Sequence, residues 1–395
     1  MKRMVGTTVR GIRAPIIKEG DDLVNIVVDC VLKASESENF ALRDKDVIGI
    51  TESLLSRAQG NYASIDDVAS DINGKFSGAI GVIFPILSRN RFANIFKGIV
   101  KSGKKIYLFL NYPSDEVGNH LMDPDMMYNS GVNPYTDILS EDEYRKIFGK
   151  KVLHPFTGID YVEMYRELAG SDNIKIYLTN DPRTALKYTK EFLVANIHER
   201  FRTKKILLDA GAEKVYSLDE VLCKPVNGSG FNPDYGLLGS NMATDNKLKL
   251  FPRDCEEFVY KVQSVLKEKT GKHIEVMIYG DGAFKDPVGK IWELADPVVS
   301  PGYTEGLKGT PNEIKIKFVA DNELNGLQGE DLDNAMRKKI EEKSKYLVGS
   351  SDSLGTTPRR ITDLIGSLCD LTSGSGDKGT PIVLIQGYFD NYASE

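Results

Sequence analysis

The chain has 395 residues, of which 41% are hydrophobic and 27% are charged, and its formal net charge is −6. This length allows two domains or one domain with a large insertion, and the composition is typical of a globular protein. The negative net charge, without a stripe of Lys and Arg interleaved with aromatic residues, argues against a nucleic-acid partner.

The N-terminus, MKRMVGTTVRGIR, is basic but lacks an apolar core, so we do not expect a signal peptide. The longest apolar runs are only long enough for strands, and we expect no membrane segment. The four cysteines are scattered without a CxxC pair, which is typical of reduced thiols in a cytoplasmic protein. The four histidines are equally dispersed, so a histidine-based zinc site is not expected.

The first expected elements lie in the stretch RAPIIKEGDDLVNIV, residues 13–27. Pro15 fixes its own φ and favours extended geometry for Ala14, so we expect the chain to enter as an extended strand. Gly20 permits a tight turn, and Asp21 or Asp22 can cap an amphipathic helix that follows. Read by itself, this stretch predicts an ordinary capped first helix.

The middle of the chain alternates between strand-like and helical patterns. DVIGIT predicts a strand that leads into ESLLSRAQG, and AIGVIFPI, KKIYLFLNYP, NIKIYLTND and KKILLDAG are further expected strands. Between them, SRNRFANIFKGIVKSG predicts a helix that ends near Gly103, and NDPRTALKYTKEFLVANIHERF predicts a helix capped by Asp181 with Pro182 at its first position. Such alternation predicts a parallel sheet with helices on its faces, and therefore a self-contained α/β unit.

The last third predicts helices and strands that return to the first domain. A helix is expected from Asp254, followed by the strand IEVMIYGDG and by a charged helix around Leu332 to Leu347. TPRRITDLIGSLCDLT predicts a helix with Thr357 as its cap and Pro358 in its first turn, before the strand PIVLIQGYF. The fold class is therefore α/β, with mixed α+β sheets.

The stretch SGSGDKG, Ser373 to Gly379, is a candidate phosphate-binding loop. Its glycines allow successive backbone N–H groups to turn toward one point, and Lys378 adds a positive charge. It is not a P-loop, because no GK[ST] is present and no helix follows. A flexible connector between a helix and a strand is the plain alternative.

Two further stretches each follow an expected strand. In YGDGAFKD, Asp281 and then Asp286 are candidate ligands for a hard divalent cation, although an Asp-Gly hairpin turn is as common. In TESLLSRAQG, Glu52 and Ser53 lie at the carboxyl end of the strand, and Arg57 is one helical turn further on. Its forked guanidinium suits a phosphate or carboxylate, whereas a solvated arginine is the alternative.

Together these stretches resemble the coenzyme F(420) γ-glutamyl ligase family, the CofE-like amide ligases. The resemblance is carried by APIIKEGDDL, DVIGITESLLSRAQG, TGKHIEVMIYGDGAFKDPVG and SGSGDKGTPIVLIQG, and it covers roughly residues 9–60 and 232–387. It implies a ligase domain formed by residues 1–65 and 226–395, interrupted by an inserted α/β unit at residues 66–225.

The resemblance also implies a nucleotide site. Ala14, Pro15, Ile16 and Ile17 contact the nucleotide largely through their backbone, Glu52, Ser53, Arg57 and Asn241 border it, and Ser373, Gly374, Ser375, Gly376, Asp377, Lys378 and Gly379 hold its phosphates. The chain departs from the family pattern at the metal ligands. One family aspartate falls near Leu238 in GLLGSN and another meets Gly280, so Asp281 would act after a shift of one residue. Asp234 or Asp245 would replace the missing partner.

The activity that the resemblance implies is GTP-dependent amide formation through an acyl phosphate, with Mg or Mn as the divalent metal. The partners are an acceptor carboxylate and L-glutamate or another amino acid, and the assembly is a homodimer. Asp281 is the expected metal ligand, and Arg57 and Lys378 supply charge to the phosphates. Leu238 favours an alternative, a regulatory protein of this fold that binds a nucleotide without ligase activity. A dinucleotide-dependent oxidoreductase ranks low, because no expected strand is followed by GxGxxG.

Overall fold

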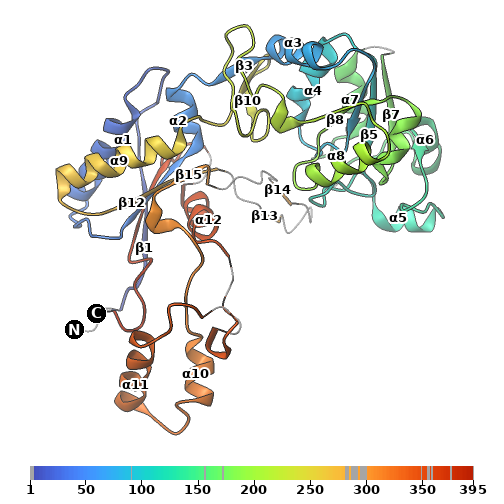
Figure 1. The fold of residues 1–395 in the computed structure, drawn as a ribbon. Helices are drawn as coiled ribbons and strands as arrows, with labels where there is room; N and C mark the ends of the chain where they lie inside the picture. The colour runs from blue at the N-terminus through green and yellow to red at the C-terminus, as the bar shows by residue number, and fades with distance from the viewer. Residues whose placement is uncertain are drawn as a thin grey trace.

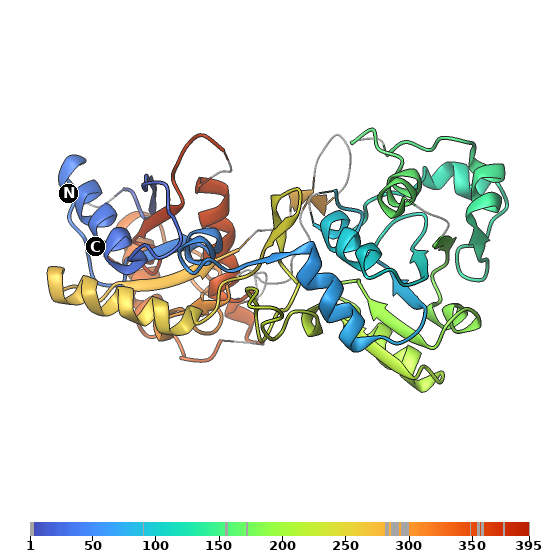
Figure 2. The ribbon, with the colours of Figure 1, turned by 90° about the horizontal axis from the view of Figure 1, so that it is seen from above.

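The computed structural model describes residues 4–89, 91–154, 157–170, 173–280, 284–285, 292–293, 300–347, 349–353, 356, 359–373 and 376–394. Figures 1 and 2 show two lobes side by side, one with both chain termini and one built from the middle of the chain. The class is α/β with mixed sheets, as predicted. Within the described residues, no helix combines the length and the apolar character needed to cross a bilayer.

A five-stranded sheet forms the centre of the first lobe. In spatial order its strands are β1 (Thr8–Ile12), β16 (Ile382–Gln386), β2 (Val47–Thr51), β12 (Glu275–Tyr279) and β15 (Gly302–Tyr303). β2 and β12 are parallel, and the other neighbours are antiparallel. Every residue of β12 and β16 is buried, because helices cover both faces of the sheet.

Helices α1 (Leu23–Ser37) and α9 (Cys255–Thr270) pack on one face, and α12 (Ile361–Ser373) packs on the other. Asp22 caps α1, since its carboxylate accepts a hydrogen bond from the backbone N–H of Asn25 at 3.2 Å. Asp21 instead accepts one from the backbone N–H of Lys18. α2 (Glu52–Ala58) begins directly after β2, as the apolar run DVIGIT predicted.

The entry strand lies earlier than expected. β1 ends at Ile12, and residues 13–18 form a loop. The strand stops here because its partner β16 begins at Ile382, opposite Ile12, and because Pro15 has no N–H to donate to a ladder. Thr357 and Pro358, the expected start of α12, lie outside the described residues.

A small helical pair extends from the first lobe on the side of the termini (Figure 1). It consists of α10 (Ile316–Asn322) and α11 (Gly329–Glu341), which enclose a core of Val319, Met336 and Ile340. The charged helix predicted around residues 332–347 is therefore found, but it starts and ends earlier. Short 3-10 turns lie nearby at Glu305–Leu307 and Ser351–Ser353.

A six-stranded sheet forms the second lobe. In spatial order its strands are β6 (Leu139–Ser140), β7 (Ile174–Leu178), β5 (Ile106–Leu110), β4 (Ile80–Ile83), β8 (Glu191–Val194) and β9 (Lys214–Ser217). Only β6 is antiparallel to its neighbour. One face carries α3 (Ile65–Lys75), α4 (Phe92–Lys101), α6 (Glu141–Phe148) and α7 (Tyr161–Ala169). The other carries α8 (Arg200–Asp209) and the 3-10 helix η1 (Pro182–Lys187).

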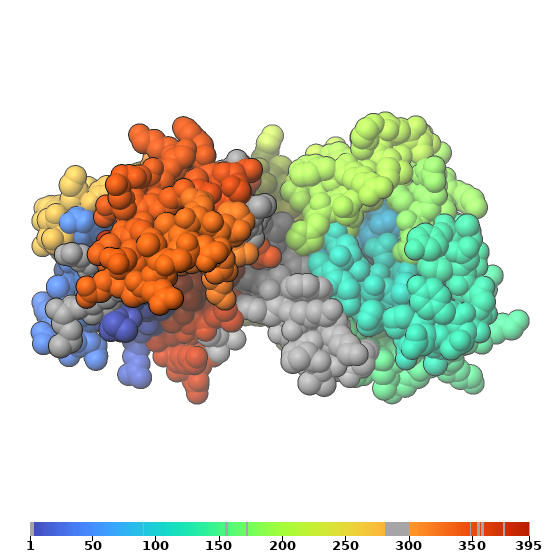
Figure 3. Space-filling view, turned by 90° about the horizontal axis from the view of Figure 1, so that it is seen from below, coloured from blue at the N-terminus to red at the C-terminus, as the bar shows by residue number. Residues whose placement is uncertain are grey.

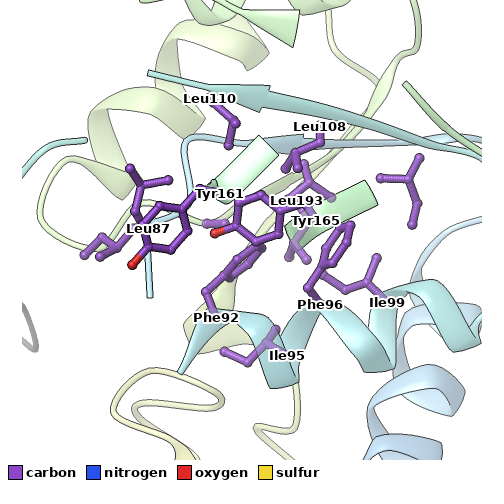
Figure 4. Packing of buried hydrophobic residues seen from close by; sticks show 14 of the residues in the cluster. Leu87, Phe92, Ile95, Phe96, Ile99, Leu108, Leu110, Tyr161, Tyr165 and Leu193 are labelled. Atoms are coloured by element: carbon purple, nitrogen blue, oxygen red, sulfur yellow. The ribbon is translucent and has the colours of Figure 1, made fainter. Parts of the chain in front are cut away.

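Aromatic packing joins the helices to this sheet. Tyr165 of α7 meets Phe92 and Phe96 of α4 edge to face, with ring centroids 5.9 and 5.4 Å apart. Figure 4 shows these rings against Leu108 and Leu193 of the sheet. Edge-to-face pairs of this kind add to the free energy that burial of the rings provides. The loop after β5 contains the short helix α5 (Pro124–Asn129).

Two sequence predictions in this lobe are wrong. KKILLDAG belongs to the helix α8 and not to a strand, because its apolar run continues the helical stretch that starts at Arg200 and turns Leu207 toward the sheet. Asp181 does cap a helix, but η1 ends at Lys187 and the strand β8 follows. A short apolar run cannot be assigned to a strand or a helix from its periodicity alone.

A third sheet connects the lobes through β10 (Asn241–Thr244), β11 (Lys247–Lys249) and β3 (Tyr62–Ser64). Leu237, Leu238, Leu248 and Leu250 belong to the hydrophobic core of the second lobe, which therefore continues past residue 225. Between β9 and this sheet lies a 3-10 turn at Leu218–Glu220, where Ser217 and Glu220 form a capping box. An isolated hairpin pairs β13 (Phe284–Lys285) with β14 (Trp292–Glu293).

Candidate active site

One edge of the five-stranded sheet gathers the candidate segments. Ile12 lies opposite Ile382, Ile382 lies opposite Ile50, and Thr51 lies opposite Tyr279. Since neighbouring strands are about 4.8 Å apart, the segments that leave these strand ends start within roughly 15 Å of each other. The segments are residues 13–17, 51–53, 376–381 and the chain after Tyr279.

Backbone hydrogen bonds join three of these segments directly. The N–H of Ala14 donates to the carbonyl oxygen of Gly379 at 3.2 Å, and the N–H of Thr51 donates to that of Pro381 at 3.1 Å. The hydroxyl of Thr380 also donates to the carbonyl oxygen of Ser373 at 2.9 Å. The N-terminal loop, the end of β2 and the glycine loop therefore form one continuous surface.

The N-terminal loop is held by one buried anchor and by α2. Ile17 is 1% exposed and packs in the core, whereas Ile16 is 82% exposed and Pro15 is also exposed. The Nε of Arg57 donates to the carbonyl oxygen of Ile17 at 3.2 Å, and the N–H of Gly20 donates to that of Ala58 at 2.9 Å. Arg57 is exposed and lies beside the loop. Only one of its five N–H groups takes part in the hydrogen bond to Ile17.

The glycine loop is an exposed turn. Gly376 has φ 112° and Gly379 has φ 64°, in the region that L-residues with a side chain rarely adopt. Asp377 and Lys378 between them are exposed. Ser373 is buried at the end of α12, where its hydroxyl donates to the carbonyl oxygen of Asp370 at 3.2 Å. Gly374 and Ser375 lie outside the described residues.

A buried ion pair borders this edge and was not anticipated. The Nζ of Lys249 lies 2.5 Å from the Oε1 of Glu52, and the side chains are 10% and 6% exposed. Asn241 lies opposite Lys249 in the β10–β11 ladder, so the structure brings Asn241 to this pair. Ser53 follows Glu52 and is partly buried. The only sequence signal for Lys249 is its place in KLKLF, where two lysines alternate with leucines.

Asp234 lies in a cleft of about 550 Å³ at the start of α9, next to the same sheet edge. The cleft is lined by Asn232, Pro233, Asp234, Tyr235, Pro252, Arg253, Asp254, Cys255, Glu256, Glu257, Tyr260 and Pro301. Burial, and then the charges of Glu52, Asp254 and Asp234, raise the pKa of the Cys255 thiol to about 12. The thiol therefore stays protonated at neutral pH.

The described residues do not by themselves fit a divalent cation. No three acidic, histidine or cysteine side chains in the described ranges are close enough to ligate one ion. Leu238 is 2% exposed and belongs to the hydrophobic core, and Asp245 lies in the hairpin turn between β10 and β11. Asp281 and Asp286 lie outside the described residues. Glu52 forms its ion pair with Lys249.

One comparison with known proteins, the match to a family model, agrees with the resemblance. The model of the family described as F420-0:Gamma-glutamyl ligase matches residues 11–387. This range includes the candidate segments at the sheet edge and the six-stranded sheet of the second lobe. A search of curated proteins gave no match. The match spans nearly the whole chain, and the candidate segments lie together at one sheet edge. The protein therefore belongs to the F420-0:Gamma-glutamyl ligase family.

Proposed function

We propose that this protein is a GTP-dependent amide ligase that joins L-glutamate or another amino acid to the carboxylate of a small-molecule acceptor. The observation that supports this most is the joining of the N-terminal loop and the glycine loop by the hydrogen bond from Ala14 to Gly379. A nucleotide that contacts residues 14–17 would reach the loop at residues 376–379 with its phosphates. Membership of a ligase family supports the use of small-molecule substrates.

The proposed reaction has two steps. An oxygen of the acceptor carboxylate attacks the γ-phosphorus of GTP, which forms an acyl phosphate and releases GDP. The neutral amine of the amino acid then attacks the acyl carbon, loses a proton, and displaces phosphate to leave an amide. The first step develops negative charge on phosphate oxygens, so it depends on positioned donors more than on covalent help from the protein.

The residues of the chain would divide this work by position. The backbone N–H groups of the glycine loop, from Gly376 to Gly379, would hold phosphate oxygens. Lys378 would add a positive charge, and the guanidinium of Arg57 would donate to a phosphate while its Nε holds the loop at Ile17. These roles require only the exposed donors that the two loops present at the sheet edge.

The metal requirement stays a prediction from the resemblance. A Mg²⁺ or Mn²⁺ ion would depend on Asp281, which lies outside the described residues, with the exposed Asp234 as the second proposed ligand. Oxygen ligands are what such hard cations select. A homodimer is also part of the proposal, and light scattering of the purified protein would measure it.

The deciding experiment combines the protein with GTP, Mg²⁺ or Mn²⁺, L-glutamate and a panel of small carboxylic acids. We expect phosphate release that requires both the amine and the acceptor, and an amide product in the mass spectrum. An acceptor labelled with ¹⁸O in its carboxylate should transfer one ¹⁸O to the released phosphate. Phosphate release that ignores both substrates would contradict the ligase reaction, and ATP in place of GTP tests the choice of nucleotide.

A second candidate function is a regulatory protein that binds the nucleotide without joining substrates. The observation in its favour is that Leu238, at the place of a family aspartate, is part of the hydrophobic core. Calorimetric binding of GTP, without turnover for any amine and acceptor of the panel, would favour this alternative over the ligase.

A further inference from the structure

The six-stranded sheet of the second lobe has a doubly wound topology. Its five parallel strands run in the spatial order β7, β5, β4, β8, β9, so the chain moves outward in opposite directions from β4 and β8. In open sheets of this kind, ligands bind beyond the carboxyl ends of the strands at the point where the order reverses. Figure 3 shows a hollow in this lobe between the lime-green segment that includes α8 and the cyan and teal segments.

A cluster of backbone donors lies at this reversal point. After β8, the N–H groups of Ile197, His198 and Glu199 all donate to the carboxylate of Glu116, at 2.5, 3.1 and 3.1 Å. These residues precede α8, whose ten residues make it long enough to carry a substantial dipole. Successive N–H groups at a helix N-terminus form a concave site for anions, and here they already hold one.

A buried side chain beside these donors has an unused polar end. Asn196 is 2% exposed, and its Nδ2 donates to the hydroxyl of Thr203 in the first turn of α8 at 3.0 Å. Its Oδ1 has no hydrogen-bond partner among the described residues. Because a hydroxyl both donates and accepts, the amide can rotate and present its NH2 group instead. A buried polar group of this kind costs free energy until a ligand satisfies it.

The carboxylate of Glu116 reaches the donors from a loop that crosses the reversal point. The neighbouring Asp115 is buried and accepts hydrogen bonds from the N–H groups of Leu87, after β4, at 2.9 Å and of Asn119 at 2.8 Å. The loop after β5 is thus fixed to the β4 side by Asp115 and to the β8 side by Glu116. Glu116 therefore lies where an anionic ligand of this crevice would bind.

We infer that residues 196–199 form a binding site for the phosphate group of a small-molecule ligand, and that Glu116 competes with that phosphate for the same N–H groups. A phosphate monoester presents three terminal oxygens, which matches three backbone donors and the amide of Asn196 better than the two oxygens of a carboxylate do. This site lies in the second lobe and is separate from the sheet edge assigned to the nucleotide.

Because Glu116 competes with phosphate, the affinity for phosphate in Glu116 variants tests the site. Removal of the Glu116 carboxylate should strengthen phosphate binding by at least about tenfold, because charge-assisted hydrogen bonds to the three N–H groups no longer have to be broken. Glu116→Gln keeps the shape of the side chain and weakens the competitor, and Glu116→Ala removes it. The two variants should therefore rank Ala above Gln above the unchanged protein in phosphate affinity.

Glu191 provides a matched control at the opposite end of β8. Its carboxylate also accepts hydrogen bonds from backbone N–H groups, those of Ser77 at 2.8 Å and Gly78 at 3.1 Å. Inorganic phosphate is the probe, its affinity is measured by calorimetry, and hydrogen exchange of the peptide 195–203 locates the site. We expect tighter phosphate binding and phosphate-dependent protection of this peptide in the Glu116 variants, and neither effect in Glu191→Gln.

Three results would overturn the inference. The first is the same gain in phosphate affinity in Glu191→Gln, which would indicate a general effect of net charge. The second is phosphate binding to folded Glu116 variants without protection of residues 195–203. The third applies if the variants do not fold: the unchanged protein should then show protection of this peptide at high phosphate, and its absence would reject the site. Phosphate bound at residues 376–379 would protect that loop equally in all variants. A failure of the proposed ligase function can therefore be distinguished from a failure of the site at residues 196–199.

Discussion

The backbone N–H of Ala14 donates a hydrogen bond to the carbonyl oxygen of Gly379, at 3.2 Å. This contact joins loops near opposite ends of the chain, because β1 and β16 are antiparallel neighbours and Ile12 lies opposite Ile382. The two loops leave the sheet at the same edge and face the same solvent. A ligand that contacts one loop therefore contacts the other, which is the physical basis of the expectations for Lys378 and Arg57.

Lys378→Ala should weaken nucleotide binding without loss of stability. Lys378 is exposed in the glycine loop, so its removal leaves the hydrophobic core unchanged but withdraws a positive charge from the phosphates. We expect roughly a tenfold higher dissociation constant for GTP by calorimetry, with the same melting temperature. Lys345→Ala, at another exposed lysine, is the control and should leave affinity unchanged. Equal affinities for both variants would remove Lys378 from the site.

Arg57→Ala should weaken nucleotide binding more than Arg57→Lys does. The alanine variant loses the hydrogen bond from Nε to the carbonyl oxygen of Ile17 and the charge beside the N-terminal loop. Lysine restores the charge but not the planar fork of donors, so about a tenfold loss should remain. GTP affinity is the measurement, and Arg202→Ala, with a side chain that is 77% exposed in the second lobe, is the control. If Arg57→Lys bound GTP as tightly as the unchanged protein, the positive charge of residue 57 and not its fork of donors would account for its role.

The buried pair of Glu52 and Lys249 should be strongly coupled. Glu52→Gln or Lys249→Met alone leaves the partner's charge buried, so either change should lower the free energy of unfolding by about 3 to 5 kcal/mol. The double variant should lose much less free energy of unfolding than the sum of the two single losses, because neither charge remains. Urea denaturation of all four proteins measures this coupling.

An exposed pair gives the control for this cycle. Lys261 and Glu257 on α9 have side chains that are 61% and 65% exposed, so Lys261→Met should change stability by less than about 1 kcal/mol. If the Glu52 and Lys249 variants were additive like this surface pair, the two charges would not interact as the 2.5 Å contact indicates.

The strands that carry the site could be predicted from the sequence because each is a short apolar run followed by turn residues. DVIGIT and PIVLIQGYF predicted β2 and β16. The resemblance implied one nucleotide site for the opening motif and the glycine loop, and a backbone hydrogen bond from Ala14 to Gly379 joins these two segments in the structure. Their register is a different matter. It depends on which strands pair across the whole chain, and no local pattern encodes that Ile12 meets Ile382. For the same reason the ion pair of Lys249 could not be predicted, because its partner Glu52 is distant in the sequence.

The second lobe was predicted in class but not in detail. Alternating strands and helices indicated a parallel sheet, which is found. The assignments failed for β8 and α8, where apolar runs of only three or four residues fit either a strand or one face of a helix. The carboxylate of Glu116 beneath α8 had no sequence signal, because the loop that carries it is ordered by tertiary hydrogen bonds of Asp115 and Glu116.

Leu238→Asp should destabilise the protein and should not create a metal site. Leu238 is 2% exposed in the hydrophobic core of the second lobe, so an aspartate there would bury an unpaired charge. We expect a loss of stability larger than the about 2 to 5 kcal/mol typical of a leucine-to-alanine change, measured by urea denaturation beside Leu238→Ala. Manganese binding, followed by electron paramagnetic resonance, should not increase. A stable variant with higher manganese affinity would show that this position can still serve as the family's ligand.

Glu191 should make the stability of the second lobe depend on pH in the acid range. Burial by itself raises its pKa, but hydrogen bonds from the Ser77 hydroxyl and from the N–H groups of Gly78 and Ser77, together with Lys214, outweigh burial and lower the pKa to about 2, from 4.5. A carboxyl with a lowered pKa in the folded state stabilises the fold above the unfolded value, and this contribution is lost as the pH falls from about 4.5 to 2. At about 1.36 kcal/mol per pKa unit, reduced by solvent screening, it amounts to about 1 to 2 kcal/mol.

The measurement compares the unchanged protein with Glu191→Gln by urea denaturation at pH 7 and pH 3. Glutamine has no charge to lose, so the stability advantage of the unchanged protein should be largest at pH 7 and smaller at pH 3. Lys214, whose Nζ lies 3.3 Å from Glu191, is present in both proteins, so the comparison isolates the change at residue 191. An advantage of the same size at both pH values would mean that the pKa of Glu191 is not lowered by these contacts.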